Sequence, residues 1–177
     1  MKLYKKGDFL TLYHIEDYYL YNSIALVKKD FYENEDLECF YCLFCADFFK
    51  SRIIPHGSFT IRKSTEGEKW YFLQRLRNIL HKDWDSKKME FIPYFTPNIG
   101  ELYYYYDDDL HKACKDICTQ YNKNELKNKY FGIFRTGQEA IDDYKNRRTY
   151  IQESRQSDIN HEARFVANML INHGTNG

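Results

Sequence analysis

The stretch YFGIFRTGQEAI, residues 130–141, combines a short apolar run with a helix start that the sequence itself marks. The aromatic and branched residues up to Phe134 predict a short strand. Thr136 and Glu139 have the spacing of a capping box, in which the Thr hydroxyl accepts from the Glu amide and the Glu carboxylate accepts from the Thr amide. The stretch therefore predicts a strand that runs directly into a capped helix, and it carries no catalytic chemistry.

A second unit of similar design begins at Phe59, 72 residues before Phe131. The apolar run from Phe59 to Ile61 is followed by basic residues and then by Thr65 and Glu68, again at capping-box spacing. The helix predicted after Thr65 places five apolar side chains on one face: Phe72, Leu73, Leu76, Ile79 and Leu80. An internal duplication and two independent uses of a common strand-to-helix solution both remain open.

Four further runs predict strands because they are rich in aromatic and branched residues. They are Phe9–Ile15, Tyr18–Val27, Met89–Phe95 and Glu101–Tyr106.

Four segments are expected to be helical. The apolar run Leu37–Phe49 could be a buried strand or a buried helix, and its length and its Cys and Ala residues favour a helix that is capped by Asn34 or Asp36 and stops at Pro55. Asp107–Asp109 is expected to cap a helix whose apolar stripe is Leu110, Ala113, Cys114, Ile117 and Tyr121. The Thr136 helix is expected to end near Gln152, and a last helix to begin near Asp158 with the stripe Ile159, Ala163, Val166 and Leu170.

Together these elements predict an α+β fold, with a small mixed or antiparallel sheet and amphipathic helices packed on it. The chain has no linker of useful length, so we expect one domain over residues 1–177, with possible lobes at 1–58 and 59–177.

Composition narrows the classes of function. Lys plus Arg and Asp plus Glu each number 26, which argues against a dedicated nucleic-acid binder and against an acidic DNA mimic. No run reaches the ~18 apolar residues that span a bilayer, so we expect no membrane partner and a cytoplasmic location, in the host cell if a phage encodes the chain. Five Cys, an odd number, favour reduced thiols over a disulfide framework.

Cysteines and carboxylates offer two candidate metal sites. Cys39, Cys42 and Cys45 could ligate a metal together with His56, but their apolar surroundings favour core thiols. Asp107–Asp109 could hold a divalent ion, although a cap with solvated charge is the simpler interpretation. We find no phosphate-binding loop, dinucleotide fingerprint, nucleophile elbow or paired zinc-binding histidines. We therefore expect a non-enzymatic protein with no catalytic residue, cofactor or metal.

Basic residues gather on the two capped helices, where they could form a contact surface. One group is Arg62, Lys63, Arg75, Arg77, His81 and Lys82, and the other is Lys145, Arg147, Arg148 and Arg155. If both helices pack on one side of the sheet, their outer faces could merge into a patch that meets phosphates or an acidic protein. The alternative, which we favour, is local neutralisation by Glu66, Glu68, Asp83, Asp142 and Asp143.

The run Tyr103–Tyr106 offers a second candidate surface. Alternation along a strand would turn two rings inward and two outward. Outward rings, taken here as Tyr104 and Tyr106, could stack on bases or anchor a protein partner, unless a neighbouring element covers them.

Residues 100–140 resemble a segment of uncharacterised phage and prophage proteins, in which a Gly-Glu-x-Tyr-Tyr-Tyr strand precedes Gly-Asn-x-Phe-Lys-Thr-Lys-Glu-Glu-Ala. Gly100 and Glu101 match its start, and the matches at its end are Gly132, Phe134, Thr136, Glu139 and Ala140. The chain departs from the pattern at Ile133, Arg135, Gly137 and Gln138. The resemblance implies a phage or mobile-element origin and transfers no catalytic residue.

Two classes of function remain. The first is an accessory protein that docks on a host protein or ribonucleoprotein complex, as inhibitors of host defence nucleases such as anti-CRISPR proteins do. The second is a nucleic-acid-binding accessory protein that uses the basic helices and exposed tyrosines. The balanced charge favours a protein partner.

Overall fold

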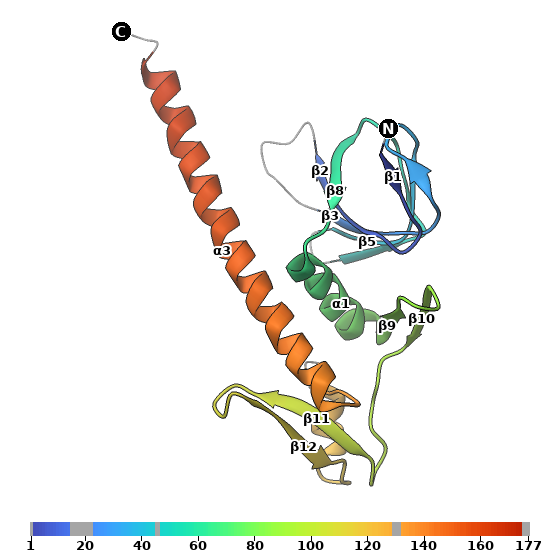
Figure 1. The fold of residues 1–177 in the computed structure, drawn as a ribbon. Helices are drawn as coiled ribbons and strands as arrows, with labels where there is room; N and C mark the ends of the chain where they lie inside the picture. Colours follow the sequence, from blue (N-terminus) through green and yellow to red (C-terminus); the bar gives the residue numbers. More distant parts are fainter. Residues whose placement is uncertain (1, 15–22, 45–46, 129–131, 175–177) are drawn as a thin grey trace.

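The structure is a computed structural model that describes residues 2–14, 23–44, 47–128 and 132–174. It has an α+β fold whose strands pair in antiparallel fashion, as the sequence predicts (Figure 1). An antiparallel sheet with its order β6-β5-β3-β2-β8 forms the N-terminal part, and β7 pairs with β5 beside it. A separate pair, β1 and β4, lies next to it in the ribbon. Their bounds are β1 Leu3–Tyr4, β2 Phe9–His14, β3 Ser23–Val27, β4 Phe31–Tyr32, β5 Leu37–Phe44, β6 Asp47–Lys50, β7 Ile53–Ile54 and β8 Phe59–Lys63.

The N-terminal sheet is packed on both faces. Along β3, Ala25 and Val27 face one core cluster, while Ile24 and Leu26 face another. The first cluster lies inside the curl of the sheet and includes Tyr4, Leu10, Leu12, Phe31 and Leu37. A strand that is buried on both faces loses the alternation of apolar and polar residues by which a half-exposed strand is recognised.

The predicted helix over Leu37–Phe49 is therefore wrong. The segment forms β5 and β6, which pair with each other from Tyr41–Lys50 to Phe44–Asp47. A bulge between Leu26 and Val27 leaves Phe40 without an opposite residue, so that Cys39 and Cys42 both reach the inner core. Their spacing of three residues resembles a helical repeat, but here it comes from the bulge.

Helix α1, Glu66–Leu80, covers the outer face of the sheet. Its buried residues Phe72 and Leu76 join a cluster with residues from β3 and β5. The hairpin of β9, Lys82–Asp85, and β10, Glu90–Pro93, adds Trp84 and Phe91 to the same cluster. Because β8 pairs with β2 and leads directly into α1, a division at residue 58 would separate β8 from its own sheet.

The C-terminal half begins with a hairpin whose first strand was predicted and whose second strand lies where a helix was expected. β11, Leu102–Asp107, pairs with β12, Lys112–Ile117, so the helix predicted after Asp109 is wrong. Asp107 Oδ1 accepts hydrogen bonds from the amides of Asp109 and Leu110. A helix cap makes the same side-chain contacts, which is why the sequence pattern was ambiguous.

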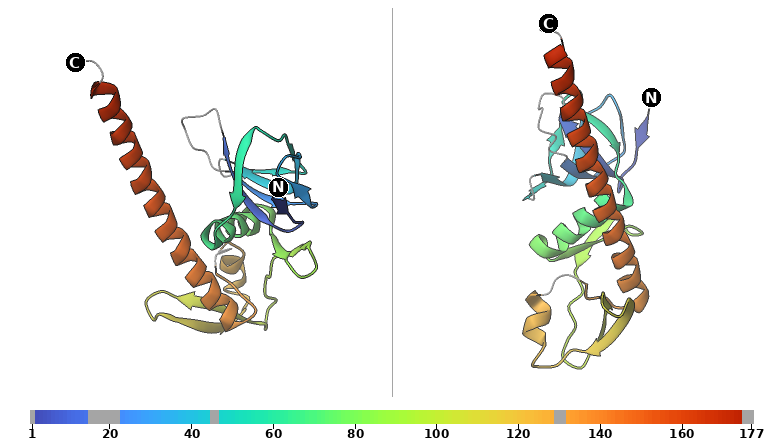
Figure 2. Two further views of the ribbon diagram at one scale, coloured as in Figure 1. Left: turned by 45° about the horizontal axis from the view of Figure 1, so that its top comes forward. Right: turned by 90° about the vertical axis from the view of Figure 1, so that its left-hand side faces the viewer.

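A 38-residue helix, α3, spans Gly137–Gly174 and closes the chain. It runs from the β11–β12 hairpin past α1, and its C-terminal part extends away from α1 (Figures 1 and 2). The break expected between Gln152 and Asp158 is wrong, because this polar segment contains no Gly or Pro and continues as helix. No helix in the described part of the chain is long and apolar enough to cross a membrane.

Both predicted capping boxes are confirmed. Thr65 Oγ1 accepts from the Glu68 amide at 3.2 Å, and Thr136 Oγ1 accepts from the Glu139 amide at the same distance. The strand expected before Thr136 is reduced to one bridge, in which Phe134 and Tyr104 exchange backbone hydrogen bonds of 2.9 Å. The start of that stretch, residues 130–131, lies outside the described residues, as does the first part of the strand predicted at Tyr18–Val27.

Candidate binding site: an aromatic cavity

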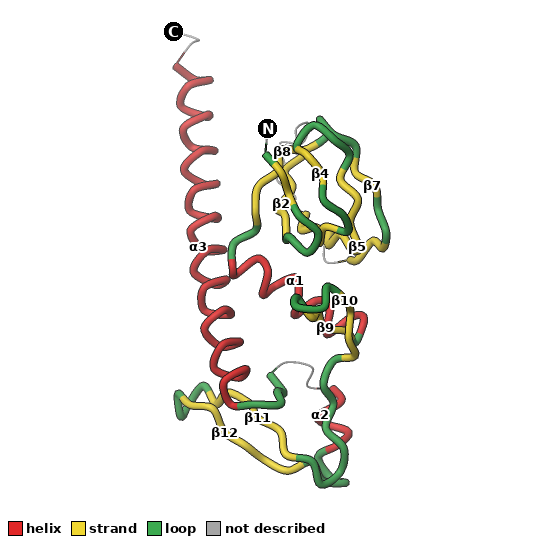
Figure 3. The backbone as a smooth tube through the Cα atoms, turned by 45° about the vertical axis from the view of Figure 1, so that its right-hand side comes forward, coloured by secondary structure: helices red, strands yellow, loops and turns green. Residues whose placement is uncertain are grey.

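A cavity of about 580 Å³ lies where the β11–β12 hairpin meets α3, α1 and the short helix α2, Lys123–Asn128. Figure 3 shows the hairpin, α2 and the start of α3 together, at the end of the molecule away from the N-terminal sheet. We call it the aromatic cavity, after the rings that line it: Trp70, Tyr103, Tyr105, Tyr106, Phe134 and Tyr144. Its charged lining residues are Asp116, Glu125, Asp143 and Arg147.

Strand alternation places the tyrosines of β11 on two opposite faces of the hairpin. Tyr103 and Tyr105 share one face, with ring centroids 6.2 Å apart, and pack with Cys118, Leu126 and Ile133 in a third core cluster. Tyr106 stacks on Tyr144 of α3, with centroids 3.8 Å apart and planes 10° from parallel. The tyrosines of β11 therefore pack against neighbouring elements and also line the cavity.

Tyr104 and Tyr106 do not project freely into solvent, as the sequence interpretation required. The ring of Tyr104 lies 3.4 Å from where a Cβ on Gly137 would stand, so it packs against the first turn of α3. Both rings are half-buried, and α3 is the neighbouring element that covers them. Of the β11 tyrosines, Tyr103, Tyr105 and Tyr106 line the cavity, whereas Tyr104 does not.

Carboxylates stand among the rings of the cavity. Asp116 Oδ2 accepts a 3.3 Å hydrogen bond from the Tyr103 hydroxyl. Burial and the charge of Asp116 raise the pKa of Tyr103 to about 12, so its hydroxyl stays protonated at neutral pH. Burial, Cys114 and the nearby carboxylates also raise the pKa of Tyr105. The rings are therefore neutral and lie in a negative surrounding.

Asp143 connects the cavity to the packing of α3 on α1. Its Oδ1 accepts from Trp70 Nε1 at 2.9 Å and from Gln74 Nε2 at 2.5 Å, and lies 3.5 Å from an Arg77 nitrogen. Burial raises the pKa of Asp143, although these three contacts favour its charged form. The contacts fix Trp70 in the cavity wall.

Arg77 is mostly buried, in contrast to its predicted place on a contact surface. Its side chain is 14% exposed and pairs with Asp83 at 2.9 Å as well as with Asp143. Arg62 likewise pairs with Glu68 at 2.6 Å, and Lys63 with Asp8 at 3.1 Å. Local neutralisation therefore holds for these members of the α1 group, and a merged basic patch that uses Arg77 is not formed.

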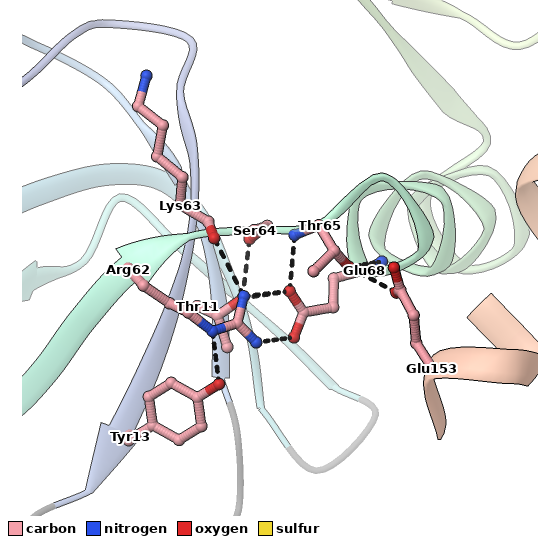
Figure 4. A network of polar contacts seen from close by, with 8 residues as sticks. All are labelled: Thr11, Tyr13, Arg62, Lys63, Ser64, Thr65, Glu68 and Glu153. Atoms are coloured by element: carbon pink, nitrogen blue, oxygen red, sulfur yellow. Dashed lines mark hydrogen bonds and ion pairs between the residues drawn. The ribbon is translucent and has the colours of Figure 1, made fainter. Parts of the chain in front are cut away.

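A polar junction of Thr11, Arg62, Thr65, Glu68 and Glu153 ties the N-terminal sheet to both helices (Figure 4). Glu68 accepts from Thr11 Oγ1 at 2.9 Å, from the Thr65 amide at 2.8 Å and from two Arg62 nitrogens at 2.6 and 2.7 Å. Thr65 Oγ1 in turn donates to Glu153 of α3 at 2.6 Å. The junction fixes how α3 lies against α1, and with it the shape of the cavity.

The four basic residues singled out on α3 do not form one surface, because Arg147 lines the cavity while the other three face solvent. Arg147 lines the cavity, pairs with Asp108 at 2.5 Å and lies 5.4 Å from the Tyr144 ring centroid. Arg148 donates to the Tyr144 hydroxyl at 3.5 Å. Lys145, Arg148 and Arg155 are exposed on α3, and the described residues form no ion pair with them. Arg75 is half-buried on α1.

The cysteines that the structure describes in β5 are core thiols, as expected. Cys39 and Cys42 are buried, and burial raises the pKa of the Cys42 thiol to about 12. Cys45 lies outside the described residues. His56 contacts Asp36 rather than a thiol, with 3.3 Å between Nδ1 and Oδ1. Within the described ranges, His, Cys, Asp and Glu form no group of three that could hold a metal.

Sequence reasoning missed most of the cavity wall. Trp70 lies in α1, Asp116 in β12 and both Asp143 and Tyr144 in α3, and no short-range spacing connects the three elements. Comparison of the chain with protein-family models, curated proteins and solved structures found no significant match.

Proposed function

We propose that this chain is a non-enzymatic accessory protein of phage or mobile-element origin that docks on a host protein through the aromatic cavity. Inhibition of a host defence nuclease, as by an anti-CRISPR protein, is the activity to test first. The observation that carries the proposal is the cavity itself, in which rings from the hairpin, α1 and α3 meet at one site. Tyrosine and tryptophan rings are enriched among the residues that dominate binding at protein interfaces.

The distribution of charge supports a protein partner over a nucleic acid. Arg62 and Arg77 are used inside the fold, while Asp116 and Glu125 line the cavity. Phosphate groups would be repelled from carboxylates at this site, and nucleic-acid binding depends on cations that neutralise phosphates.

The test is capture from host lysate after nuclease treatment, followed by binding of the identified partner in purified form. We expect Tyr105→Phe to keep capture, because the ring stays, and Tyr105→Ala to lose at least ~1 kcal/mol of binding, about fivefold. Tyr32→Ala, an exposed tyrosine of the N-terminal part, is the matched control. Equal binding by all three variants would show that the cavity is not the docking site.

A nucleic-acid-binding function is a second candidate, because Lys145, Arg148 and Arg155 lie exposed along α3. Binding of this kind falls steeply between low and moderate salt, whereas a contact anchored by aromatic rings does not. Lys145→Glu combined with Arg148→Glu would abolish it. If that double variant, rather than Tyr105→Ala, eliminates capture, the nucleic-acid function replaces the first proposal.

A further inference from the structure

We propose that the aromatic cavity receives the cationic side chain of an arginine or lysine from the docked protein. This deepens the proposed function and rests on it, since it names the chemistry of the group that the cavity would bind.

The rings supply one half of the recognition. A guanidinium or ammonium group is attracted to the face of a tyrosine or tryptophan. Trp70 of α1 and both Tyr103 and Tyr105 of β11 line the cavity, so rings reach it from two different elements, while the Tyr144 ring is stacked on Tyr106. The same region already places guanidiniums over rings, with Arg135 4.5 Å from the Phe95 centroid and Arg147 5.4 Å from that of Tyr144.

The carboxylates supply the other half. Two of the four charged groups in the wall are matched inside the chain, because Arg147 pairs with Asp108 and Asp143 lies against Arg77. Asp116 and Glu125 take part in no ion pair with the residues that the structure describes. The Asp116 carboxylate is held in place by the Tyr103 hydroxyl, which donates without neutralising its charge. The cavity therefore has a net negative charge that a partner's cation would balance.

The size of the cavity agrees with a side chain on a peptide. Its volume of about 580 Å³ lies within the usual range of ligand pockets. It leaves room for the cationic group together with part of its stem and neighbouring residues.

The two tryptophans of the chain allow a direct test by NMR. The indole N–H of Trp70 lines the cavity and donates to Asp143, whereas Trp84 lies in the core beside the N-terminal sheet. The probes are N-acetyl-arginine amide and its neutral isostere N-acetyl-citrulline amide, added to the full chain at millimolar concentrations. We expect the arginine probe to shift the Trp70 indole signal saturably and to leave the Trp84 signal in place. Citrulline should bind roughly tenfold more weakly, since it lacks the charge.

Charge variants provide the second arm. Asp116→Asn and Glu125→Gln should each weaken the arginine probe by roughly twofold to fivefold, as expected for partly exposed charge pairs. Asp109→Asn changes the same charge in the exposed hairpin turn outside the cavity wall and should have no effect.

Equal binding of arginine and citrulline, or no shift of the Trp70 signal, would overturn the inference. A shift caused by inorganic phosphate in place of arginine would overturn it as well. The docking function would still stand in any of these cases if Tyr105→Ala had lost capture of the partner, so the two failures can be told apart.

Discussion

The two capping boxes of this protein share a sequence pattern but differ in their surroundings. At Thr65, the Glu68 carboxylate receives the cap amide together with Arg62 and Thr11, and the Thr65 hydroxyl reaches Glu153 on α3. At Thr136, the exposed Glu139 carboxylate accepts from the backbone amides of Arg135 and Thr136 and from no other group among the described residues. One motif therefore joins three parts of the fold, while the other only starts a helix.

The comparison separates what a motif does locally from what it contributes to the whole fold. Local hydrogen bonds are alike in both boxes, with the same 3.2 Å distance from the Glu amide to the Thr oxygen. The difference in stabilisation must then come from the tertiary partners of Glu68 and Thr65. Matched substitutions in the two capping boxes would measure this difference in stabilisation.

The largest difference is expected for the two glutamates. Glu68→Ala leaves the half-buried Arg62 guanidinium and the buried Thr11 hydroxyl without their carboxylate, which should cost roughly 2–4 kcal/mol in the free energy of unfolding. Glu139→Ala removes one exposed acceptor and should cost ~0.5–1 kcal/mol. Urea denaturation measures both, and losses of similar size would show that the junction around Glu68 contributes nothing beyond the cap.

A glycine lies in the first turn after each capping threonine, two residues after Thr65 and one residue after Thr136, and the two glycines should respond to substitution in opposite directions. A Cβ on Gly67 would stand 2.7 Å from the Tyr150 Cα of α3, so Gly67→Ala should force the helices apart and cost roughly 1–3 kcal/mol. A Cβ on Gly137 would make ordinary contacts with Tyr104 and Ala113. Gly137→Ala should therefore stabilise the protein by up to ~1 kcal/mol.

Thermal and urea unfolding of both glycine variants provide the measurement. Destabilisation by Gly137→Ala comparable with that of Gly67→Ala would mean that close approach to α3 is not the cause of the difference.

The costs of replacing the two threonines, in free energy of unfolding, should differ by the contribution of about one hydrogen bond. Thr136→Ala loses a cap worth ~1 kcal/mol. Thr65→Ala loses the cap and also the hydrogen bond to Glu153, for a total of ~2 kcal/mol. In a Glu153→Ala background the cost of Thr65→Ala should fall to that of Thr136→Ala, and a double-mutant cycle would measure the coupling.

The smallest effect is a change in acid sensitivity. Burial alone would raise the pKa of Glu68, but hydrogen bonds from Arg62, Thr65 and Thr11 outweigh it and hold this pKa below its ordinary value. The stability that Glu68 contributes is therefore complete above its unfolded pKa and is lost as the pH falls through the folded pKa. The advantage of the natural chain over Glu68→Gln should shrink as the pH falls below about 4.3.

Asp143 provides a control of opposite sign. Burial raises its pKa, so its titration contributes stability at low pH that is lost as the pH rises through the folded value. The free energy of unfolding of the natural chain should therefore rise relative to that of Asp143→Asn as the pH falls. Equal pH slopes for both variants, measured by urea unfolding between pH 3 and 6, would contradict both assignments.

Elements with a local signature could be predicted from the sequence. Thr65 with Glu68 and Thr136 with Glu139 placed both helix starts correctly, because a cap depends on residues that are three apart. The aromatic run at 101–106 was rightly predicted as a strand, since its composition already favours one.

Elements that depend on distant partners could not be predicted. Strand β5 is buried on both faces and contains a bulge at Phe40, so its pattern imitates a buried helix. Asp107 makes the same contacts in a hairpin turn as in a helix cap, and only the pairing of β11 with β12 distinguishes the two.

The candidate site shows the same division. Of the basic residues and the outward tyrosines that the sequence singled out, the structure places only Arg147 and Tyr106 in the wall of the cavity. The sequence could not predict that Trp70 of α1, Asp116 of β12 and Asp143 of α3 share this site. Their proximity depends on how α3 packs against α1 and the hairpin.

By itself, the sequence of this protein determined the α+β class, both capped helix starts and the balance of charge, all of which depend on composition or short-range spacing. Tertiary structure alone decided that Glu68 is a junction while Glu139 is a simple cap, and that six rings and four charges enclose one cavity. The physical reason is that burial and charge pairing depend on neighbours far apart in the chain, and only the packing of the folded chain brings those neighbours together.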